Sequence, residues 1–249
     1  MRLDITSAKY RIKSAIEKAF DLCSIQLKRA MGEIELVVVI MDGSEDSRVI
    51  ALLLHRLNGE CSAAIITPKD LGTDNVGKNL ATYMSKGVKQ RAFLVVLDQE
   101  ELQLNEVWRR IEDSLKKHGI AYKECEPGDR WKIYSCNHGD KEFLVGVVIN
   151  GRDLPFQKHS IEDHLLELLN KLADTTSSQQ LTSLRVAANS SKDAWSKIAK
   201  NNHDVQRMVY SAVVNSEHAS TVFQQHVNAV ERLRKMLRGQ RFDCGKSST

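Results

Sequence analysis

Two continuously apolar runs rich in β-branched residues dominate the hydrophobic pattern of the chain. They cover residues 36–41 and 93–97, and a segment with helical periodicity follows each of them. Uninterrupted apolar runs that alternate with helices are typical of central strands in a parallel sheet buried on both faces. The pattern predicts strands at about 35–41, 63–67 and 92–97, and helices at 47–57, 75–85 and 102–118.

The flanking regions add helices and a hairpin. Apolar residues at helical spacing from Ser7 to Met31 predict an amphipathic helix that leads into the sheet. Apolar runs at 131–136 and 142–150, on either side of a Gly-Asp turn, predict a hairpin at one edge of the sheet. After Pro155 the pattern predicts a leucine-rich helix at 161–173, a polar linker at 174–180 and a largely helical segment at 181–239.

This order of elements predicts an α/β fold, namely a doubly wound parallel sheet with a C-terminal helical appendage. The chain has 249 residues, 42% of them apolar, and is therefore long enough to bury a sizeable core. We expect three parts: an N-terminal amphipathic helix over residues 1–33, an α/β domain over 34–158 and a basic helical region over 159–249.

Acidic residues follow both central apolar runs directly. Asp42-Gly43-Ser44-Glu45-Asp46 comes after the first, and Asp98-Gln99-Glu100 comes after the second. Ligands of parallel sheets collect at the carboxyl ends of the strands, so these acids are expected at one edge. Carboxylates gathered there repel one another unless a cation lies between them, and their oxygens suit hard divalent ions such as Mg²⁺. The sequence therefore predicts a metal site.

The remaining composition indicates a cytoplasmic protein with no membrane contact. No stretch approaches the roughly 18 apolar residues of a membrane span, and the charged first residues lack the apolar core of a secretion signal. The five cysteines show no C-x-x-C spacing, which argues against a zinc site or a disulfide framework. We expect reduced thiols.

Basic charge is concentrated in the last third of the chain. Residues 1–170 hold 24 Lys and Arg against 26 Asp and Glu, whereas residues 171–249 hold 12 against 6. A basic region beside an acidic metal site suits an enzyme that binds nucleic acid through its phosphates. The candidate phosphate-binding residues are Lys78, Arg234, Lys235 and Arg238, although a solvated surface or a favourable charge at a helix end explains them equally well.

The two acidic motifs together resemble the Toprim domain of topoisomerases, bacterial-type primases and OLD-family nucleases. The likeness covers about residues 34–150, with acid-Gly after one strand and acid-x-acid after another. Ser160-Ile161-Glu162-Asp163, before a leucine-rich helix, is similar to the acidic helix start of OLD-like and small archaeal-type Toprim proteins. The resemblance implies cleavage or transfer at a phosphodiester that depends on Mg²⁺ or Mn²⁺.

Each acid has a role in this interpretation. Asp42 is the general acid or base and a further candidate metal ligand, and Asp98 and Glu100 hold the metal. Asp46 lies one helical turn beyond Asp42, where it orients a water or caps the helix. Glu162 and Asp163 are additional candidate acids, and the simpler interpretation of both is a favourable charge in the first turn of a helix.

Other functions stay open at this point. The family usually has Glu where Asp42 stands and Asp where Glu100 stands, and each exchange moves a carboxylate by one methylene. The alternative is therefore a degenerate Toprim protein that binds nucleic acid or assembles without cleaving. A phosphatase of small phosphoesters is a third option, although its D-x-D is replaced by Asp42-Gly43-Ser44. The sequence does not decide whether the nucleic acid is DNA or RNA, or whether the reaction cuts or joins strands. A homodimer is possible as well.

Overall fold

Seven strands form one sheet in the order β1-β3-β2-β4-β7-β6-β5 within the described part of the chain. The computed structural model describes residues 1–6, 8–30, 33–57, 62–86, 90–172, 188–199 and 202–239. Neighbours from β1 to β7 in this order are parallel, and β6 and β5 are antiparallel. The strands are β1 (Arg2–Asp4), β2 (Leu36–Ile40), β3 (Ser62–Ile66), β4 (Ala92–Asp98), β5 (Ala121–Pro127), β6 (Trp131–His138) and β7 (Lys141–Asn150).

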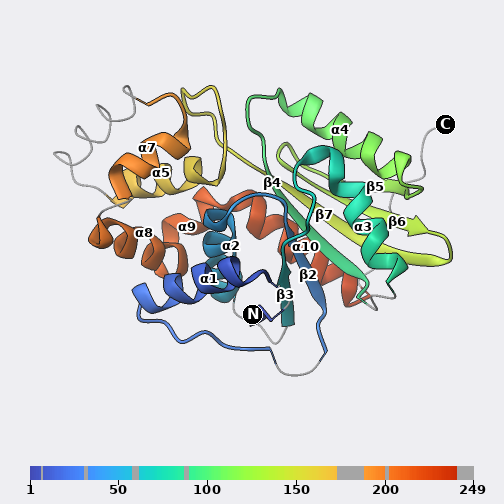
Figure 1. Ribbon diagram of the computed structural model, residues 1–249, viewed down its shortest axis with the longest axis horizontal. Coiled ribbons are helices and arrows are strands. Elements are labelled where there is room, and N and C mark those ends of the chain that lie inside the picture. The colour runs from blue at the N-terminus through green and yellow to red at the C-terminus, as the bar shows by residue number, and fades with distance from the viewer. Residues whose placement is uncertain are drawn as a thin grey trace.

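Helices cover both faces of the sheet, which confirms the predicted α/β class (Figure 1). One face carries η1 (Thr73–Asn75), α3 (Val76–Ser85) and α4 (Leu104–Lys117). The other face carries α1, α2 and the C-terminal helices. Their bounds are α1 (Tyr10–Leu22), α2 (Ser44–Arg56), α5 (Ile161–Leu172), α7 (Ser191–Ala199), α8 (His203–Asn215), α9 (Glu217–Val222) and α10 (Gln224–Leu237).

Residues along β2 alternate between the two cores. Val37 and Val39 pack beneath α3 and α4, whereas Val38 and Ile40 belong to the larger core on the opposite face. Both sets are buried, which explains why this strand is an unbroken apolar run in the sequence. The C-terminal helices bury apolar side chains in the same core as α1 and α2. They therefore stand directly over the strands that end in the acidic motifs.

One expected helix ends earlier than predicted, and two strands lie where none was predicted. The N-terminal helix ends at Leu22, because Ser24 adopts a left-handed conformation (φ 55°) and the following apolar residues alternate as in extended chain. Strand β1 was not predicted, because three residues are too few to show the alternation of apolar and polar positions that marks a strand. Strand β5 is a largely exposed edge strand, so its sequence lacks an apolar alternation. The linker expected at 174–180 lies outside the described residues.

The described cysteines differ in whether their thiols are free. Cys23 and Cys136 carry free thiols. Cys125 is disulfide-bonded, so the expectation of reduced thiols is wrong at that position. Among the described residues, no helix combines the length and the apolar character that crossing a bilayer requires.

Candidate metal centre

Three adjacent parallel strands end in polar residues at the same edge of the sheet. Asp42 follows β2, Asp98 ends β4, and Asn150 ends β7, directly opposite Asp98 in the strand register. The backbone N–H of Asp98 donates to Oδ2 of Asp42 over 2.7 Å, so the two strand ends are joined by a hydrogen bond. The sheet alone thus brings the two sequence motifs into contact.

Asp42, Asp98 and Glu100, the acidic triad, offer carboxylate oxygens that lie within 4.8 Å of one another. Asp98 is buried, Asp42 is half-buried, and Glu100 is exposed. Glu100 has a left-handed backbone (φ 56°), a conformation that costs a residue with a Cβ on the order of 1–2 kcal/mol. Two hydrogen bonds of 2.9 Å with the backbone of His159 hold it there. Strain of this kind is characteristic of functional sites.

A single buried amide fixes the spacing of the carboxylates behind the triad. The Nδ2 group of Asn150 donates to Oδ1 of Asp46 over 2.7 Å and to Oδ1 of Asp98 over 2.9 Å. The ring of His226 lies 2.8 Å from Oδ1 of Asn150, and because that oxygen only accepts, His226 donates through Nε2. Burial lowers the pKa of His226 to about 3, so its ring stays neutral. The amide is therefore locked in one orientation.

Asp46 serves two partners. One oxygen accepts from the backbone N–H of Gly43 over 3.1 Å and so caps α2, as the simpler interpretation of this residue predicts. Its other oxygen accepts from Asn150 and faces the centre. Asp46 is only 3% exposed, which makes it a member of the buried site as well as a cap.

Burial and repulsion between neighbouring acids raise the pKa of Asp42, Asp46, Asp98 and Glu162. Burial raises the pKa of Asp98 and of Asp46 well above the ordinary value, and the neighbouring acids raise it further. Burial likewise raises the pKa of Asp42 to about 6, and that of Glu162 rises for the same reason. Negative charge at this edge is therefore under-compensated by the protein itself, which is the condition that a bound cation relieves.

Lys192 of α7 is a nearby cation. Burial lowers the pKa of its ammonium group, but the charges of Glu162, Asp98, Asp46 and Glu100 outweigh that effect, and the net pKa is raised. A second ammonium, that of Lys158, lies 4.0 Å from Glu100 but is closer to Glu101, which leaves a group of five acids facing two ammonium groups. Lys192 therefore balances only part of the charge.

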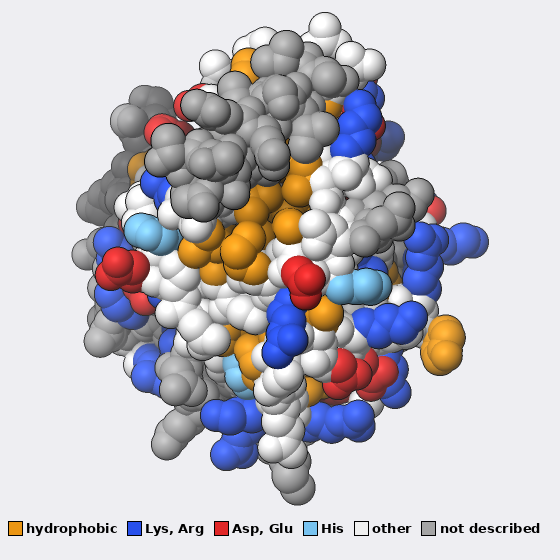
Figure 2. All heavy atoms as spheres, turned by 90° about the vertical axis from the view of Figure 1, so that its left-hand side faces the viewer, with side chains coloured by type: hydrophobic (Ala, Val, Ile, Leu, Met, Phe, Trp, Pro, Cys, Tyr) orange, Lys and Arg blue, Asp and Glu red, His pale blue; other side chains and the backbone are white. Residues whose placement is uncertain are grey.

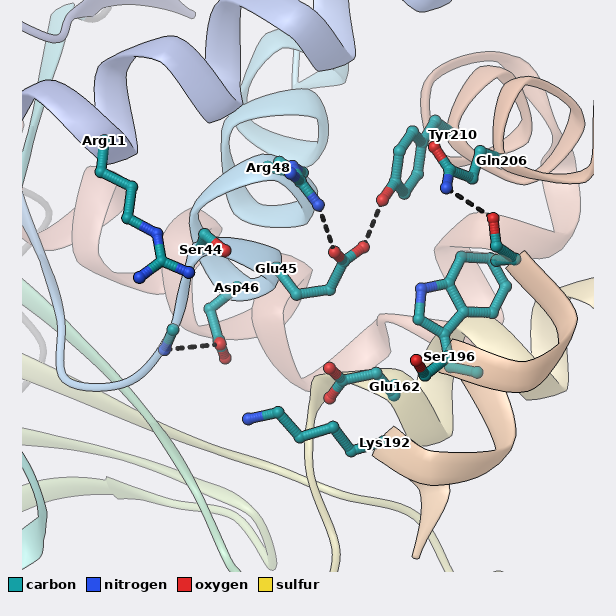
Figure 3. A pocket seen from close by; sticks show the side chains of 13 residues that line it. Arg11, Ser44, Glu45, Asp46, Arg48, Glu162, Lys192, Ser196, Gln206 and Tyr210 are labelled. Carbon is teal, nitrogen blue, oxygen red and sulfur yellow. Dashed lines mark hydrogen bonds and ion pairs between the residues drawn. The ribbon is translucent and has the colours of Figure 1, made fainter. Parts of the chain in front are cut away.

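The side chains of the adjacent residues Glu162 and Asp163 have different partners. Glu162 accepts from the Ser160 hydroxyl over 2.7 Å and lines a pocket together with Asp46 (Figure 3). Asp163 points elsewhere, accepting from the Arg152 backbone N–H and lying 2.8 Å from the His159 ring. Glu162 thus belongs to the acidic group, and Asp163 holds the loop that leads into α5.

The predicted phosphate-binding residues are not members of the acidic group. Lys78 is on α3, on the opposite face of the sheet, and pairs with Asp70 over 2.7 Å. Arg234, Lys235 and Arg238, the basic cluster, line a shallow hollow at the C-terminal end of α10 with Glu231. On the face that carries α7 and α8, Lys and Arg side chains are dispersed among acidic ones (Figure 2).

Sequence reasoning missed Asn150, His226 and the position of Lys192. Asn150 ends an apolar strand as the two aspartates do, so its place at a third strand end was a usable signal. His226 and Lys192 come from helices far along the chain, and only the packing of α7 and α10 brings them to the sheet edge. A comparison of the chain with family models, with curated proteins and with solved structures finds no match.

Proposed function

We propose that this protein is a divalent-metal-dependent enzyme that cleaves or transfers phosphodiesters of nucleic acid. The observation that carries the proposal is the convergence of Asp42, Asp98 and Glu100 within 4.8 Å at the carboxyl edge of adjacent parallel strands. The donors are all carboxylate oxygens, which suit Mg²⁺ or Mn²⁺. One acidic motif follows β2 and the other begins at the end of β4, the neighbouring parallel strand, which agrees with the motif pattern on which the Toprim resemblance rests.

The buried acids also support a cation at this edge. Four carboxyl groups have raised pKa values, two within the triad and two beside it, and Lys192 offsets only part of their charge. Asp98 and Glu100 would hold the ion with Asp42. A bound Mg²⁺ or Mn²⁺ would polarise a phosphate oxygen and neutralise charge that develops on it.

Separate residues of the chain would handle the proton, attract the phosphate and position the acids. One oxygen of Asp42 is held by the Asp98 N–H, which leaves the other to exchange a proton or to bind the ion. The Lys192 ammonium, on the Glu162 side of the centre, is placed to attract a phosphate. Asn150 keeps Asp46 and Asp98 at a fixed separation.

Incubation of the purified full chain with single- and double-stranded DNA and RNA tests this proposal. We expect new strand ends with Mg²⁺ or Mn²⁺ and none with chelator. Glu100→Gln should abolish cleavage and the metal-dependent rise in melting temperature. Glu101→Gln is the matched control, because Glu101 is exposed, pairs with Lys158 and lies outside the triad.

Two results would contradict the proposal. If millimolar Mg²⁺ or Mn²⁺ does not change the melting temperature of the wild type, the acidic triad does not bind these metals. Metal-dependent binding of nucleic acid without new ends favours the non-cleaving alternative, a degenerate Toprim protein.

A further inference from the structure

A side pocket of about 550 Å³ opens directly beside the acidic group (Figure 3). Asp46 and Glu162 belong to both, so a ligand in the pocket would be adjacent to whatever occupies the triad. The opposite wall comes from α7 and α8 and includes Trp195, Gln206 and Tyr210. The volume lies within the range of roughly 300–1,000 Å³ that is usual for sites enclosing a small ligand.

One part of the pocket wall is fixed by internal hydrogen bonds. Arg48 donates to Glu45 over 2.7 Å, and the hydroxyl of Tyr210 donates to the other oxygen of Glu45. Burial raises the pKa of Tyr210, so this hydroxyl is neutral. Gln206 is held as well, because its Nε2 donates to the backbone carbonyl of Ala199 over 2.6 Å. These groups form a pre-formed polar surface that joins α2 to α8.

Another part of the wall presents donors that have no partner. Among the described residues, the Arg11 guanidinium and the indole N–H of Trp195 make no hydrogen bond or ion pair, although Trp195 is only 5% exposed. The hydroxyls of Ser44 and Ser196 face the same space without a recorded partner in that part of the chain. These donors border the open pocket, where a ligand with acceptor atoms can bond to them. The pocket is therefore built to receive a ligand rich in acceptors.

We propose that the side pocket binds one unpaired nucleotide unit of a strand whose adjacent phosphodiester lies at the acidic triad. This inference rests on the proposed function and assigns its substrate class as single-stranded nucleic acid or an unpaired strand end. A nucleotide combines an acceptor-rich base and sugar with an anionic phosphate, which matches the free donors and Arg11. A base that is still paired in a duplex cannot enter a pocket recessed between helices without leaving the stack.

Binding of a fluorescein-labelled short oligothymidylate to the full chain tests the inference without any need for cleavage. The measurement is fluorescence anisotropy in Ca²⁺ and, separately, in chelator. Arg11→Gln removes an exposed cation, and Ser196→Trp fills the pocket from an exposed helix position. We expect Arg11→Gln to weaken binding by about tenfold, the usual scale for losing one charge-assisted hydrogen bond, and Ser196→Trp to weaken it at least as much because the indole fills the space of the ligand. Lys18→Gln, an exposed residue of α1 outside the pocket, is the matched control.

Competition separates the parts of the ligand. Thymidine monophosphate should displace the oligonucleotide, inorganic phosphate should not, and a blunt duplex should compete at least about tenfold less well than a single strand. Oligouridylate in place of oligothymidylate tells RNA from DNA. Equal competition by inorganic phosphate, or wild-type affinity in both Arg11→Gln and Ser196→Trp, overturns the inference, as does a wild-type chain that binds no oligonucleotide in either condition.

The two proposals fail in different ways. If pocket variants weaken binding but no metal supports cleavage, the side pocket stands and the enzymatic proposal falls. If the chain cleaves with metal while the pocket variants keep the wild-type KM for single strands, the enzymatic proposal stands and the side pocket falls.

Discussion

Polar residues at one end of helix α10 are buried, whereas those at the other end are exposed to solvent. At its N-terminal end, Gln225 and His226 are buried and bond to the carboxyl end of β7, Gln225 to the Ile149 carbonyl and His226 to Asn150. At its C-terminal end, Lys235 and Arg238 of the basic cluster are exposed to solvent. The rise of an α-helix puts roughly 18 Å between His226 and Arg238.

The two ends differ in whether hydrogen bonds fix the side chains in place. The N-terminal end contributes few charges, yet Gln225 and His226 bond to the end of β7, and Asn150 of that strand bonds to two carboxylates of the acidic group. The C-terminal end has more charge but no fixed geometry to match a particular ligand. Changes near the N-terminal end should therefore alter chemistry, and changes at the C-terminal end should alter only long-range attraction.

Asp98→Asn should have the largest effect. Asp98 belongs to the triad and is held by Asn150, so its loss should lower metal affinity by more than about a hundredfold and abolish cleavage with it. Calorimetric titration with Mn²⁺ and a cleavage assay measure the two effects. If metal affinity survives while cleavage is lost, Asp98 is not a ligand.

Asn150→Ala should come next, with a loss of about 10–100-fold in metal affinity, the scale expected when an outer partner of a metal ligand is removed. It also leaves the His226 N–H without its acceptor. Asn228→Ala makes the same chemical change on α10 at a residue outside this network and should leave the Mn²⁺ titration unchanged. Equal affinities in the two variants would mean that the Asn150 amide does not position the acids.

A smaller effect is expected in the pH dependence of stability without metal. The pKa of Asp42 is raised to about 6 in the folded chain and is about 3.9 in an unfolded one, so the folded state binds the proton more tightly. Its contribution to stability is then lost as pH rises from about 4 through 6. Asp42→Asn cannot ionise, and in chelator it should melt a few degrees higher than wild type at pH 8.

The comparison of melting curves at low pH is the control for that prediction. At pH 4 the carboxyl of Asp42 is protonated in the folded wild type, so the difference from Asp42→Asn should vanish. Addition of Mg²⁺ at pH 8 should reverse the order of the two proteins. A constant difference across the pH range would exclude Asp42 as its source.

The smallest effect on chemistry should follow from replacing Arg234, Lys235 and Arg238 together with Ser. If the basic cluster contacts phosphates, the slope of log affinity against log salt on duplex DNA should flatten by up to about 3. The cleavage rate at saturating substrate should not change, because the cluster is far from the triad. A changed rate at saturation would contradict the separation between the two ends of α10.

Much of the sheet and one half of the site could be predicted from sequence, for a clear physical reason. Buried parallel strands are apolar runs, and the residues that follow them must meet at one edge, so Asp42, Asp98 and Glu100 could be placed before any coordinates. Asp163 could not be separated from Glu162, because the choice depends on which one turns toward Arg152 and His159. Lys192 and His226 depend on how helices pack, and no local pattern encodes that.

Asn150 has one further consequence, which concerns chemical ageing. It is followed by Gly151, whose φ of +131° and whose approach to His159, 2.8 Å from where a Cβ would lie, leave room for glycine alone. Asn-Gly is the pair most open to deamidation, since the glycine nitrogen attacks the amide carbon with little hindrance, ammonia leaves, and water then opens the cyclic imide to a carboxylate. In the folded chain that nitrogen donates to His164, and the amide is held at three points. Each excursion to the unfolded state exposes the pair, and its product is another carboxylate in a site already crowded with them, so an aged preparation should lose its metal affinity before it loses its fold.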